Sequence, residues 1–426
     1  MTLTEQITGL ARDAKTASRE LARLSSEERD LALQAMAEAL AGAGPELLAA
    51  NALDLEVGKT LGLSSAMMDR LTLNEARIAA MAGGVQEVAA LPDPVGRILD
   101  ERVRPNGLRL QKISTPIGVV VIIYESRPNV TADAASLCFK TGNATILRGG
   151  KEALNSNQTI ARLMVEAGRR TLGPRFPAAA IQVVPTTDRE AVPILLSQTQ
   201  YVDLCMPRGG EGLIRAVTEC SKVPVIKHYK GVCHLYVDRE ADLNMAESIL
   251  WNAKVQRPSA CNAVETLLVD RAVAVEFLPR AARKLQSRNV EFRGDAQSLE
   301  LLQGIPDLRM KLATDQDYAT EYNDYVLNVR VIAGVGEAVD HIHQFGSAHS
   351  DAIVTANEAT ARKFLTDVDS ATVYWNASTR FTDGGEFGMG AEIGISTDKV
   401  GARGPMGLEE LCSYKWLGWG TGQVRG

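Results

Sequence analysis

The chain has 426 residues, of which 45% are hydrophobic and 23% are charged, and this length and composition indicate two or three domains with sizeable buried cores. The formal net charge is −6 and the sequence has no long basic run, which argues against a nucleic-acid partner. No apolar run is long enough to cross a bilayer and the N-terminal segment lacks the apolar core of a signal peptide, so we expect a cytoplasmic protein without a membrane partner.

Residues 1–98 are expected to be mainly helical. Ser25 and Glu28 form a capping-box pattern ahead of an apolar stripe at helical spacing. Gly44-Pro45 interrupts this stripe and starts another helix, because proline is well tolerated in the first helical turn. These patterns predict a helical segment before the first strand.

A β-hairpin is expected around Asn106-Gly107. The flanking residues alternate between apolar and polar, and Asn-Gly favours a tight turn in which both central residues have positive φ. A hairpin of this length would present unpaired edges. Two arrangements are open: either the hairpin's own chain covers it, or it is an arm that pairs with another subunit.

From Pro116 onward, expected strands alternate with expected helices. The run IGVVVIIY (117–124) is continuously apolar and β-branched, as in a strand that is buried on both faces. Four further strands are expected in ATILRGG, AIQVVP, YVDLCMP and VPVIKHY, with helical segments between them. This alternation predicts a doubly wound parallel sheet, and such sheets bind ligands at the carboxyl ends of their strands.

Two turns of this sheet could hold the phosphates of a nucleotide, although the GxGxxG turn of an ordinary dinucleotide-binding domain is missing. One is RGGK, which runs from Arg148 to Lys151 after the second strand. The other contains Gly209 and Gly210, which open a helix whose first N–H groups attract anions. For either motif alone, an ordinary strand-to-helix turn is the alternative. Because Arg148 and Lys151 suit a ribose 2′-phosphate, NADP(H) is expected rather than NAD.

One of the six cysteines has a context that core packing does not explain. No cysteine belongs to a CxxC pair or has zinc-ligand spacing, so no metal site is expected. Cys261 lies in VQRPSACNA, a loop between an expected helix and an expected strand, close to Lys254 and Arg257. Nearby cations lower the pKa of a thiol, which makes Cys261 a candidate nucleophile. Four others lie in or beside expected helices or strands as packing residues: Cys138, Cys205, Cys220 and Cys233.

Five segments carry more specific motifs: YESRPNVTADA (124–134), VDLCMPRGG (202–210), NAKVQRPSACNAVETLLV (252–269), HIHQFGSAHSDAI (341–353) and NASTRFTDGGEFGMGAEIGISTDKVGARGPMGL (376–408). In this order they resemble the aldehyde dehydrogenase superfamily, and closely its gamma-glutamyl phosphate reductase (glutamate-5-semialdehyde dehydrogenase) family, over nearly the whole chain. The resemblance implies an α/β fold and a homo-oligomer. The implied parts are a Rossmann-type NADP-binding domain (1–98 and 117–230), an α/β catalytic domain (231–395) and an oligomerisation element (99–116 and 400–426), in which the tail GLEELCSYKWLGWG pairs with the hairpin.

The same resemblance implies a reaction, in which NADPH reduces L-glutamyl 5-phosphate to L-glutamate 5-semialdehyde and phosphate through a thioester on Cys261, in proline biosynthesis. Hydrolytic aldehyde dehydrogenases carry a glutamate base in a glycine-rich turn, but the matching stretch here, from His228 to Gly231, has no carboxylate. This departure favours phosphate exchange over hydrolysis. A contact with glutamate 5-kinase, which would hand over the labile acyl phosphate, is an open question.

The resemblance also carries over other site residues by position. Glu321 matches the acid that holds the nicotinamide ribose. Ser126 aligns with the superfamily's oxyanion asparagine, Asn129 is the nearby alternative, and the Cys261 backbone N–H is a further oxyanion donor. Guanidinium forks suit the anionic groups of the substrate, and Arg257 is our choice for the phosphate. The candidates for the phosphate and the α-carboxylate are Arg127, Arg257 and Arg380.

The histidines of the segment 341–353 do not predict a metal site. His341 and His343 are expected to point to different sides of a helix. His349 and Asp351 are expected to shape the substrate loop.

Two rival functions are an aldehyde dehydrogenase that hydrolyses its thioester without phosphate, and a non-catalytic NADP-binding regulator that would tolerate alkylation of its thiol.

Overall fold

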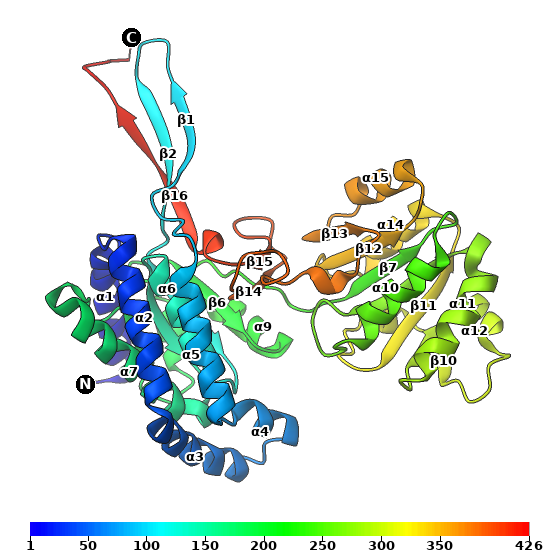
Figure 1. The fold of residues 1–426 in the computed structure, drawn as a ribbon, viewed down its shortest axis with the longest axis horizontal. Coiled ribbons are helices and arrows are strands. Elements are labelled where there is room, and N and C mark those ends of the chain that lie inside the picture. Colours follow the sequence, from blue (N-terminus) through cyan, green and yellow to red (C-terminus); the bar gives the residue numbers. More distant parts are fainter. Residues whose placement is uncertain (426) are drawn as a thin grey trace. The chain divides into compact units, whose positions relative to one another are not determined.

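A computed structural model describes residues 1–425 and divides the chain into two compact units. Each unit is built around a parallel β-sheet, as Figure 1 shows. No helix among the described residues has the length and apolar character that a membrane span requires. The first unit contains residues 1–227, Gly388–Gly394 and the chain from Met406 onward, and the second contains His228–Phe387 and Ile395–Pro405.

The first unit opens with helices, as the sequence predicts. Ser25 precedes the second of them and its hydroxyl oxygen accepts from Glu28 N at 3.1 Å, while the Glu28 carboxylate accepts from Ser25 N at 2.8 Å. The predicted capping box is therefore confirmed. Pro45 lies in the first turn of the next helix, also as predicted. The helices before the first strand are α1 (Leu3–Leu21), α2 (Ser26–Gly42), α3 (Gly44–Thr60), α4 (Ser65–Leu71) and α5 (Glu75–Ala90).

A four-stranded parallel sheet with the order β5-β4-β3-β6 forms the centre of this unit. The predicted fifth strand, VPVIKHY, is wrong, because only Val225 pairs, in an isolated bridge with Cys205. Pro224 has no N–H to donate before this bridge and Pro207 of the neighbouring strand has none to donate after it, so the bridge does not extend into a ladder. The strands are β3 (Val119–Tyr124), β4 (Ala144–Arg148), β5 (Ile181–Val183) and β6 (Leu204–Arg208), and the helices between and after them are α6 (Asn129–Lys140), η1 (Lys151–Ala153), α7 (Leu154–Leu172), η2 (Gly173–Arg175), α8 (Ala191–Leu196) and α9 (Glu211–Cys220).

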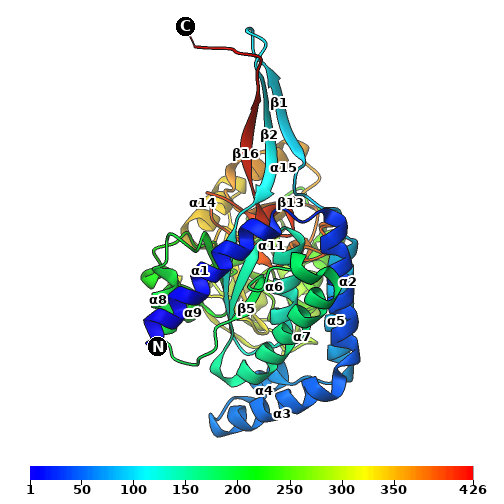
Figure 2. The same cartoon turned by 90° about the vertical axis from the view of Figure 1, so that its left-hand side faces the viewer.

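A three-stranded antiparallel arm extends from the rest of the first unit (Figure 1, Figure 2). Strands β1 (Ile98–Val103) and β2 (Arg109–Pro116) form the predicted hairpin. Strand β16 (Cys412–Trp419) pairs with β2 along its whole length, so the predicted contribution of the tail is confirmed. The chain's own tail thus covers one edge of the hairpin, and the role of the arm in oligomerisation stays a prediction.

The turn of the hairpin differs from the two-residue turn that Asn106-Gly107 predicts. Gly107 N donates to Arg104 O at 2.9 Å, and of the two predicted turn residues Gly107 alone has positive φ, at 83°. Pro105 explains the difference, because proline fixes its own φ near −65° and favours the second position of a type I turn. The Asn-Gly pair therefore occupies the end of a longer loop.

The second unit has a seven-stranded sheet with the order β10-β9-β11-β8-β7-β12-β13 and parallel pairing throughout. Leu235 and Val237 belong to one core and Tyr236 to another, because successive side chains of a strand point to opposite faces. Together with the antiparallel arm, these sheets confirm the predicted α/β class. The strands are β7 (Cys233–Val237), β8 (Val264–Asp270), β9 (Glu291–Gly294), β10 (Met310–Leu312), β11 (Val326–Ile332), β12 (Ser350–Val354) and β13 (Thr372–Trp375).

Helices cover both faces of this second sheet. The core with Leu235 and Val237 includes side chains of three helices, and the core with Tyr236 includes side chains of two others. The short strands β14 (Gly394–Ser396) and β15 (Gly404–Met406) pair with each other near the end of the chain. The helices are α10 (Leu243–Val255), α11 (Arg271–Gln286), α12 (Ala296–Leu302), α13 (Asp315–Tyr318), α14 (Val335–Phe345) and α15 (Glu358–Asp367), with the short turn η3 (Thr379–Phe381). The short turn η4 (Glu409–Leu411) belongs to the first unit.

Candidate active site

Cys261 lies in the loop between α10 and β8 of the second unit, in the position that the sequence predicts. Its side chain is partly exposed, whereas Cys138, Cys205 and Cys233 are buried. Burial raises the pKa of Cys138 to about 12, so this thiol stays protonated near neutral pH. A substrate can therefore reach Cys261, while the buried cysteines are packing residues.

Hydrogen bonds fix the shape of this loop. Ala263 N donates to Ala260 O at 2.9 Å and closes a turn around the cysteine. Asn262 is bonded on two sides: its Nδ2 donates to Thr382 O at 2.8 Å, and Thr379 Oγ1 donates to Asn262 O at 2.6 Å. The segment around η3 thus holds the neighbour of the candidate nucleophile.

Gly231 is a point of very close approach to the cysteine. A Cβ atom at Gly231 would lie 1.7 Å from the carbonyl oxygen of Cys261. This oxygen belongs to the main chain and cannot rotate away, so residue 231 must be glycine. Cys233 Sγ donates to the same oxygen at 3.4 Å. The turn from His228 to Gly231 and the loop of Cys261 therefore position each other.

Gly231→Ala is expected to lower the turnover number at least about 100-fold, since a misplacement of about 1 Å at a reacting centre can cost this much. Steady-state kinetics would measure the effect. Gly336→Ala is the matched control in the same unit, because, apart from its neighbours in the helix, no atom of residues 1–425 would lie within 4 Å of a Cβ there. Wild-type turnover by Gly231→Ala would show that the close approach does not position the thiol.

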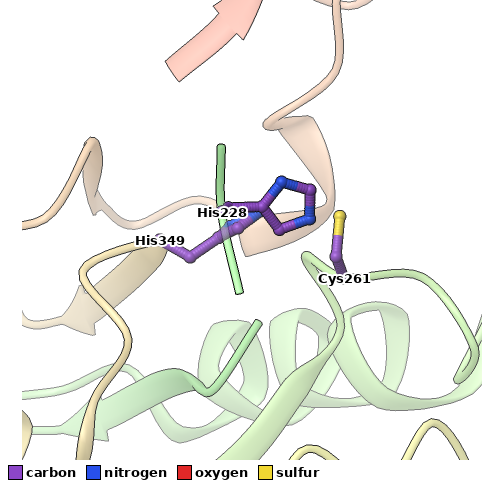
Figure 3. Close-up of side chains that lie close together, drawn as sticks. All are labelled: His228, Cys261 and His349. Carbon is purple, nitrogen blue, oxygen red and sulfur yellow. The ribbon is translucent and has the colours of Figure 1, made fainter. Parts of the chain in front are cut away.

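Two imidazole rings accompany Cys261, as Figure 3 shows. One ring nitrogen of His228, one of His349 and the Sγ atom of Cys261 all lie within 4.8 Å of one another. His349 is fully buried, and this burial, with a smaller effect of His228, lowers its pKa to about 3. His349 is therefore neutral near neutral pH. An imidazole beside a thiol is an arrangement that activates cysteine nucleophiles.

Arg257 and Arg380 place positive charge near the thiol. Arg257 is exposed on the loop of Cys261, and Arg380 is half-buried with its Nε donating to Gln256 Oε1 at 3.0 Å. Burial and then the charge of Arg257 lower the pKa of Arg380, whereas the negative charge of the Cys261 thiolate raises it. Asn262 Nδ2, next to Cys261 in the chain, donates to Arg380 O at 3.5 Å, so Arg380 lies beside the loop that carries Cys261 and Arg257. Such a cluster suits an anionic substrate and favours the thiolate.

A buried ion pair joins the two ends of the segment that carries Cys261. Lys254 lies near the end of α10 and Glu265 near the start of β8; both side chains are buried, with Nζ and Oε2 2.7 Å apart. Burial lowers the pKa of Lys254 and raises the pKa of Glu265 to about 7, while their mutual attraction opposes both shifts. The pair therefore fixes the spacing of the helix and the strand.

The first unit contains the two predicted phosphate turns. Arg148 ends β4, and its Nε is buried and has no hydrogen-bond partner among the described residues. Burial lowers the pKa of Arg148; the nearby Glu152 opposes this shift and the positive charge of Arg189 adds to it. Lys151 begins the next helical turn and is exposed. These cations and the unpartnered guanidinium nitrogen fit a phosphate group.

The turn at Gly209 and Gly210 fits a phosphate less well. Gly210 precedes α9, and no side chain in the described part of the chain caps this helix. However, Gly210 N donates to Glu125 Oε2 at 3.2 Å. A carboxylate at this helix start competes with a phosphate for the same N–H group. The cofactor roles of both turns stay predictions.

The predicted oxyanion side chains also lie in the first unit and already have hydrogen-bond partners there. Ser126 is buried, its hydroxyl donates to Glu152, and its backbone N donates to Glu152 Oε1 at 3.2 Å. Asn129 Nδ2 donates to Asp133 Oδ2 at 2.9 Å. Either side chain would exchange a partner to bind an oxyanion. Their oxyanion roles, and the substrate role of the exposed Arg127, stay predictions.

Other predicted residues have distinct surroundings in the second unit. Glu321 is half-buried in the loop between α13 and β11, and its cofactor role stays a prediction. On α14, His341 is buried and His343 is exposed, as expected for different sides of a helix. Asp351 is buried in β12, where its Oδ1 lies 2.8 Å from His234 Nδ1. We therefore assign Asp351 to the core rather than to a substrate loop.

The sequence prediction gave no role to the imidazole of His228. The sequence signal for His228 is its position in the turn that aligns with the glutamate-containing turn of hydrolytic aldehyde dehydrogenases. The prediction used only the absence of a carboxylate from this turn. Arg189 was also missed, because nothing in its local sequence connects it with Arg148.

Comparisons with known proteins show the family to which the chain belongs. The profile of the aldehyde dehydrogenase family matches residues 2–298. The chain is 52% identical to gamma-glutamyl phosphate reductase of Opitutus terrae, covering 99% of each chain, and 52% identical to that of Geobacter metallireducens, covering 100% of each. The crystal structure of gamma-glutamyl phosphate reductase from Thermotoga maritima matches with a TM-score of 0.95 and 42% identity, covering 99% of this chain and 100% of that one. The chain therefore belongs to the aldehyde dehydrogenase family and, within it, to the gamma-glutamyl phosphate reductase family.

Proposed function

We propose that this chain catalyses the NADPH-dependent reduction of L-glutamyl 5-phosphate to L-glutamate 5-semialdehyde and phosphate, a step of proline biosynthesis, through a thioester on Cys261. The observation that carries this proposal is the partly exposed thiol on a fixed loop, with His228 and Arg380 beside it. The names of full-length relatives at 52% identity support the choice of substrate.

The first step forms the thioester. The Cys261 thiolate attacks the γ-acyl carbon, the bond from this carbon to the phosphate oxygen breaks, and inorganic phosphate leaves. Arg257 and Arg380 attract the phosphate and lower the energy of the thiolate, since charge-assisted bonds from guanidinium groups are among the strongest that a protein makes. Phosphate is also the group that re-enters when the reaction runs backward.

The second step reduces the acyl group. NADPH, when bound, supplies the hydride that converts the thioester to a hemithioacetal. The carbon–sulfur bond then breaks, which releases the semialdehyde and returns the Cys261 thiolate. Each oxyanion along this path needs preorganised donors, and one donor lowers the barrier by about 3–4 kcal/mol. The backbone N–H of Cys261 is our candidate, because it belongs to the same residue as the reacting sulfur and to a loop that hydrogen bonds fix.

Three cations of the first unit would hold the 2′-phosphate of NADPH: Arg148, Lys151 and Arg189. The unpartnered Nε of Arg148 supports this choice, because a buried guanidinium nitrogen without a partner is costly unless a ligand binds it. Glu321 would hold the nicotinamide ribose. An acidic residue instead of these cations would favour NAD.

The absence of a carboxylate from the turn His228–Gly231 supports phosphate exchange over hydrolysis. A thioester persists when no base activates water against it. Phosphate can then attack the thioester and release the acyl group from Cys261. A hydrolytic aldehyde dehydrogenase would instead discharge its thioester with water.

The direct test of this function follows NADPH formation from glutamate 5-semialdehyde and NADP⁺ with and without phosphate. We expect continuous turnover with phosphate and no more than one NADPH per active site without it. Continuous turnover without phosphate would support hydrolysis and contradict the exchange mechanism. A tenfold preference for NAD⁺ over NADP⁺ would contradict the proposed role of Arg148.

A further inference from the structure

Three metal-ligating side chains from separate segments meet at the candidate active site. His228 lies in the turn before β7, Cys261 in the loop before β8, and His349 directly before β12. Figure 3 shows the three side chains next to one another, and their potential ligand atoms lie within 4.8 Å of one another. No spacing rule for zinc sites predicts this group, because its members are far apart in the sequence.

Hydrogen bonds leave Nε2 as the ligand nitrogen of His349. Its Nδ1 lies 2.8 Å from Ser350 Oγ and 3.8 Å from Cys233 Sγ. Ser350 donates its proton to Thr382 at 2.7 Å, and Cys233 donates to the carbonyl oxygen of Cys261. Both neighbours thus accept from Nδ1, so the ring proton is on Nδ1 and the lone pair is on Nε2. This Nε2 is buried and without a hydrogen-bond partner among residues 1–425.

The same reasoning fixes the tautomer of His228. Its Nδ1 lies 2.8 Å from the backbone oxygen of Ile395, and a carbonyl oxygen can only accept. Nδ1 therefore carries the proton, and neutral His228 also has its lone pair on Nε2. A bond from the second ring nitrogen to a backbone carbonyl is typical of histidines that bind metals, because it orients the ring and raises its basicity.

We propose that Cys261 Sγ, His228 Nε2 and His349 Nε2 form a binding site for one Zn²⁺ ion, which blocks the thiol when it is bound. Zinc takes thiolate and imidazole ligands in tetrahedral sites, and sites with three protein ligands keep the fourth position for water. Binding replaces the thiol proton of Cys261, which is released to solvent. Mg²⁺ and Ca²⁺ prefer oxygen ligands and do not fit this set.

The observed spacing is close to that of a formed site. With Zn–S and Zn–N bonds of roughly 2.3 and 2.0 Å, tetrahedral ligand atoms lie roughly 3.3–3.6 Å apart. One ring nitrogen of each histidine and the Sγ atom of Cys261 are within 4.8 Å of one another, so a small rotation of the side chains closes the site. The partly exposed side chain of Cys261 supplies this freedom, although its loop is fixed, whereas the side chain of His349 is held by burial.

The consequence for activity rests on the proposed function, because zinc and an acyl group would compete for the same sulfur. Zn²⁺ is then a reversible inhibitor that a chelator removes. The spectroscopic and chemical tests below do not need a working substrate, so they judge the metal site even if the reaction is a different one.

The test uses Co²⁺ as a spectroscopic substitute for Zn²⁺ on the full-length, reduced, metal-free protein. We expect one equivalent of Co²⁺ to produce the near-ultraviolet thiolate-to-cobalt charge-transfer band and the visible bands of tetrahedral cobalt, and Zn²⁺ to remove both. Cys261→Ser should lose the charge-transfer band. A spectrum without this band, or one that Cys261→Ser retains, would overturn the proposal.

Histidine variants then identify the nitrogen ligands. His228→Gln and His349→Gln should each weaken Zn²⁺ binding at least about 100-fold, because loss of an outer partner alone costs 10–100-fold. His343→Gln is the control, since this exposed histidine on α14 bonds Asp367 O and lies outside the group. His228 is only half-buried, so His228→Gln keeps the test open if His349→Gln does not fold. Equal weakening by His343→Gln, or none by His228→Gln, would overturn the assignment.

Alkylation gives an independent readout. One equivalent of Zn²⁺ should slow the reaction of iodoacetamide with Cys261 at least tenfold in the wild type and leave it unchanged in His228→Gln. Unprotected Cys261 in zinc-loaded wild type would contradict the site. Inhibition of turnover by Zn²⁺ is measured separately. If Zn²⁺ protected Cys261 from iodoacetamide without inhibiting turnover, the blocking role would be overturned. If Cys261→Ser were active, the proposed function would be refuted, but the metal site would not be affected.

Discussion

Cys261→Ser is expected to lower the turnover number for semialdehyde oxidation at least about 1,000-fold. A serine hydroxyl is almost fully protonated at neutral pH, so the nearby cations that favour a thiolate cannot produce a comparable alkoxide. The substitution changes one atom on a partly exposed loop, and the fold should therefore persist. Loss of a nucleophile removes most of the catalysis that its supporting residues provide, because such groups act as a unit.

Steady-state kinetics and thermal unfolding together test this expectation. Cys220→Ser is the matched control, since Cys220 is also partly exposed but lies on α9 of the first unit. It should keep wild-type turnover. If Cys261→Ser retained a tenth of the wild-type turnover, a thioester at residue 261 would be ruled out.

Lys254→Met is expected to destabilise the second unit by about 3–5 kcal/mol at pH 8, because it leaves the carboxylate of Glu265 buried without its partner. For a unit of this size, the temperature midpoint should fall by at least about 6 °C. Differential scanning calorimetry resolves the transition. Turnover should also fall, because the Lys254–Glu265 pair joins α10 and β8, which lie on either side of Cys261.

The loss should shrink as the pH falls. Without Lys254, the folded-state pKa of Glu265 rises further above its unfolded value of about 4.3, so the folded state binds the extra proton. The variant is then least destabilised below the unfolded pKa and loses stability as pH rises through the folded pKa. Lys363→Met, which breaks an exposed pair with Asp367, is the control and should cost less than about 0.5 kcal/mol. A pH-independent loss would contradict the role of Glu265.

The sequence predicted the parts of the fold that local patterns encode. The apolar run of β3 is buried at every residue, and the capping box before α2 has both of its hydrogen bonds. The loop of Cys261 was predictable because a helical pattern ends before it and a β-branched pattern begins after it. One failure was also local in origin, because Pro105 changes the hairpin turn, whereas the expected fifth strand forms only an isolated bridge at Val225.

The candidate site was less predictable, because its surroundings depend on tertiary contacts. The carbonyl oxygen of Cys261 would be 1.7 Å from a Cβ at residue 231, and no property of the sequence HYKG indicates this approach. The sequence predicts that His349 shapes a substrate loop, but the lone pair on its Nε2 depends on the bonds that its Nδ1 donates to Ser350 and Cys233. The proximity of Arg380 to Cys261 likewise follows from the packing of η3 against the loop.

The most direct test of the central claim is to identify the acyl-enzyme. The wild-type protein is mixed with glutamate 5-semialdehyde and NADP⁺ without phosphate, quenched in acid and digested for peptide mass spectrometry. We predict one glutamyl group on the peptide that contains Cys261, and its loss within one turnover after phosphate is added. NADPH formation with Cys261 unmodified, or an acyl group on another residue, would contradict the account.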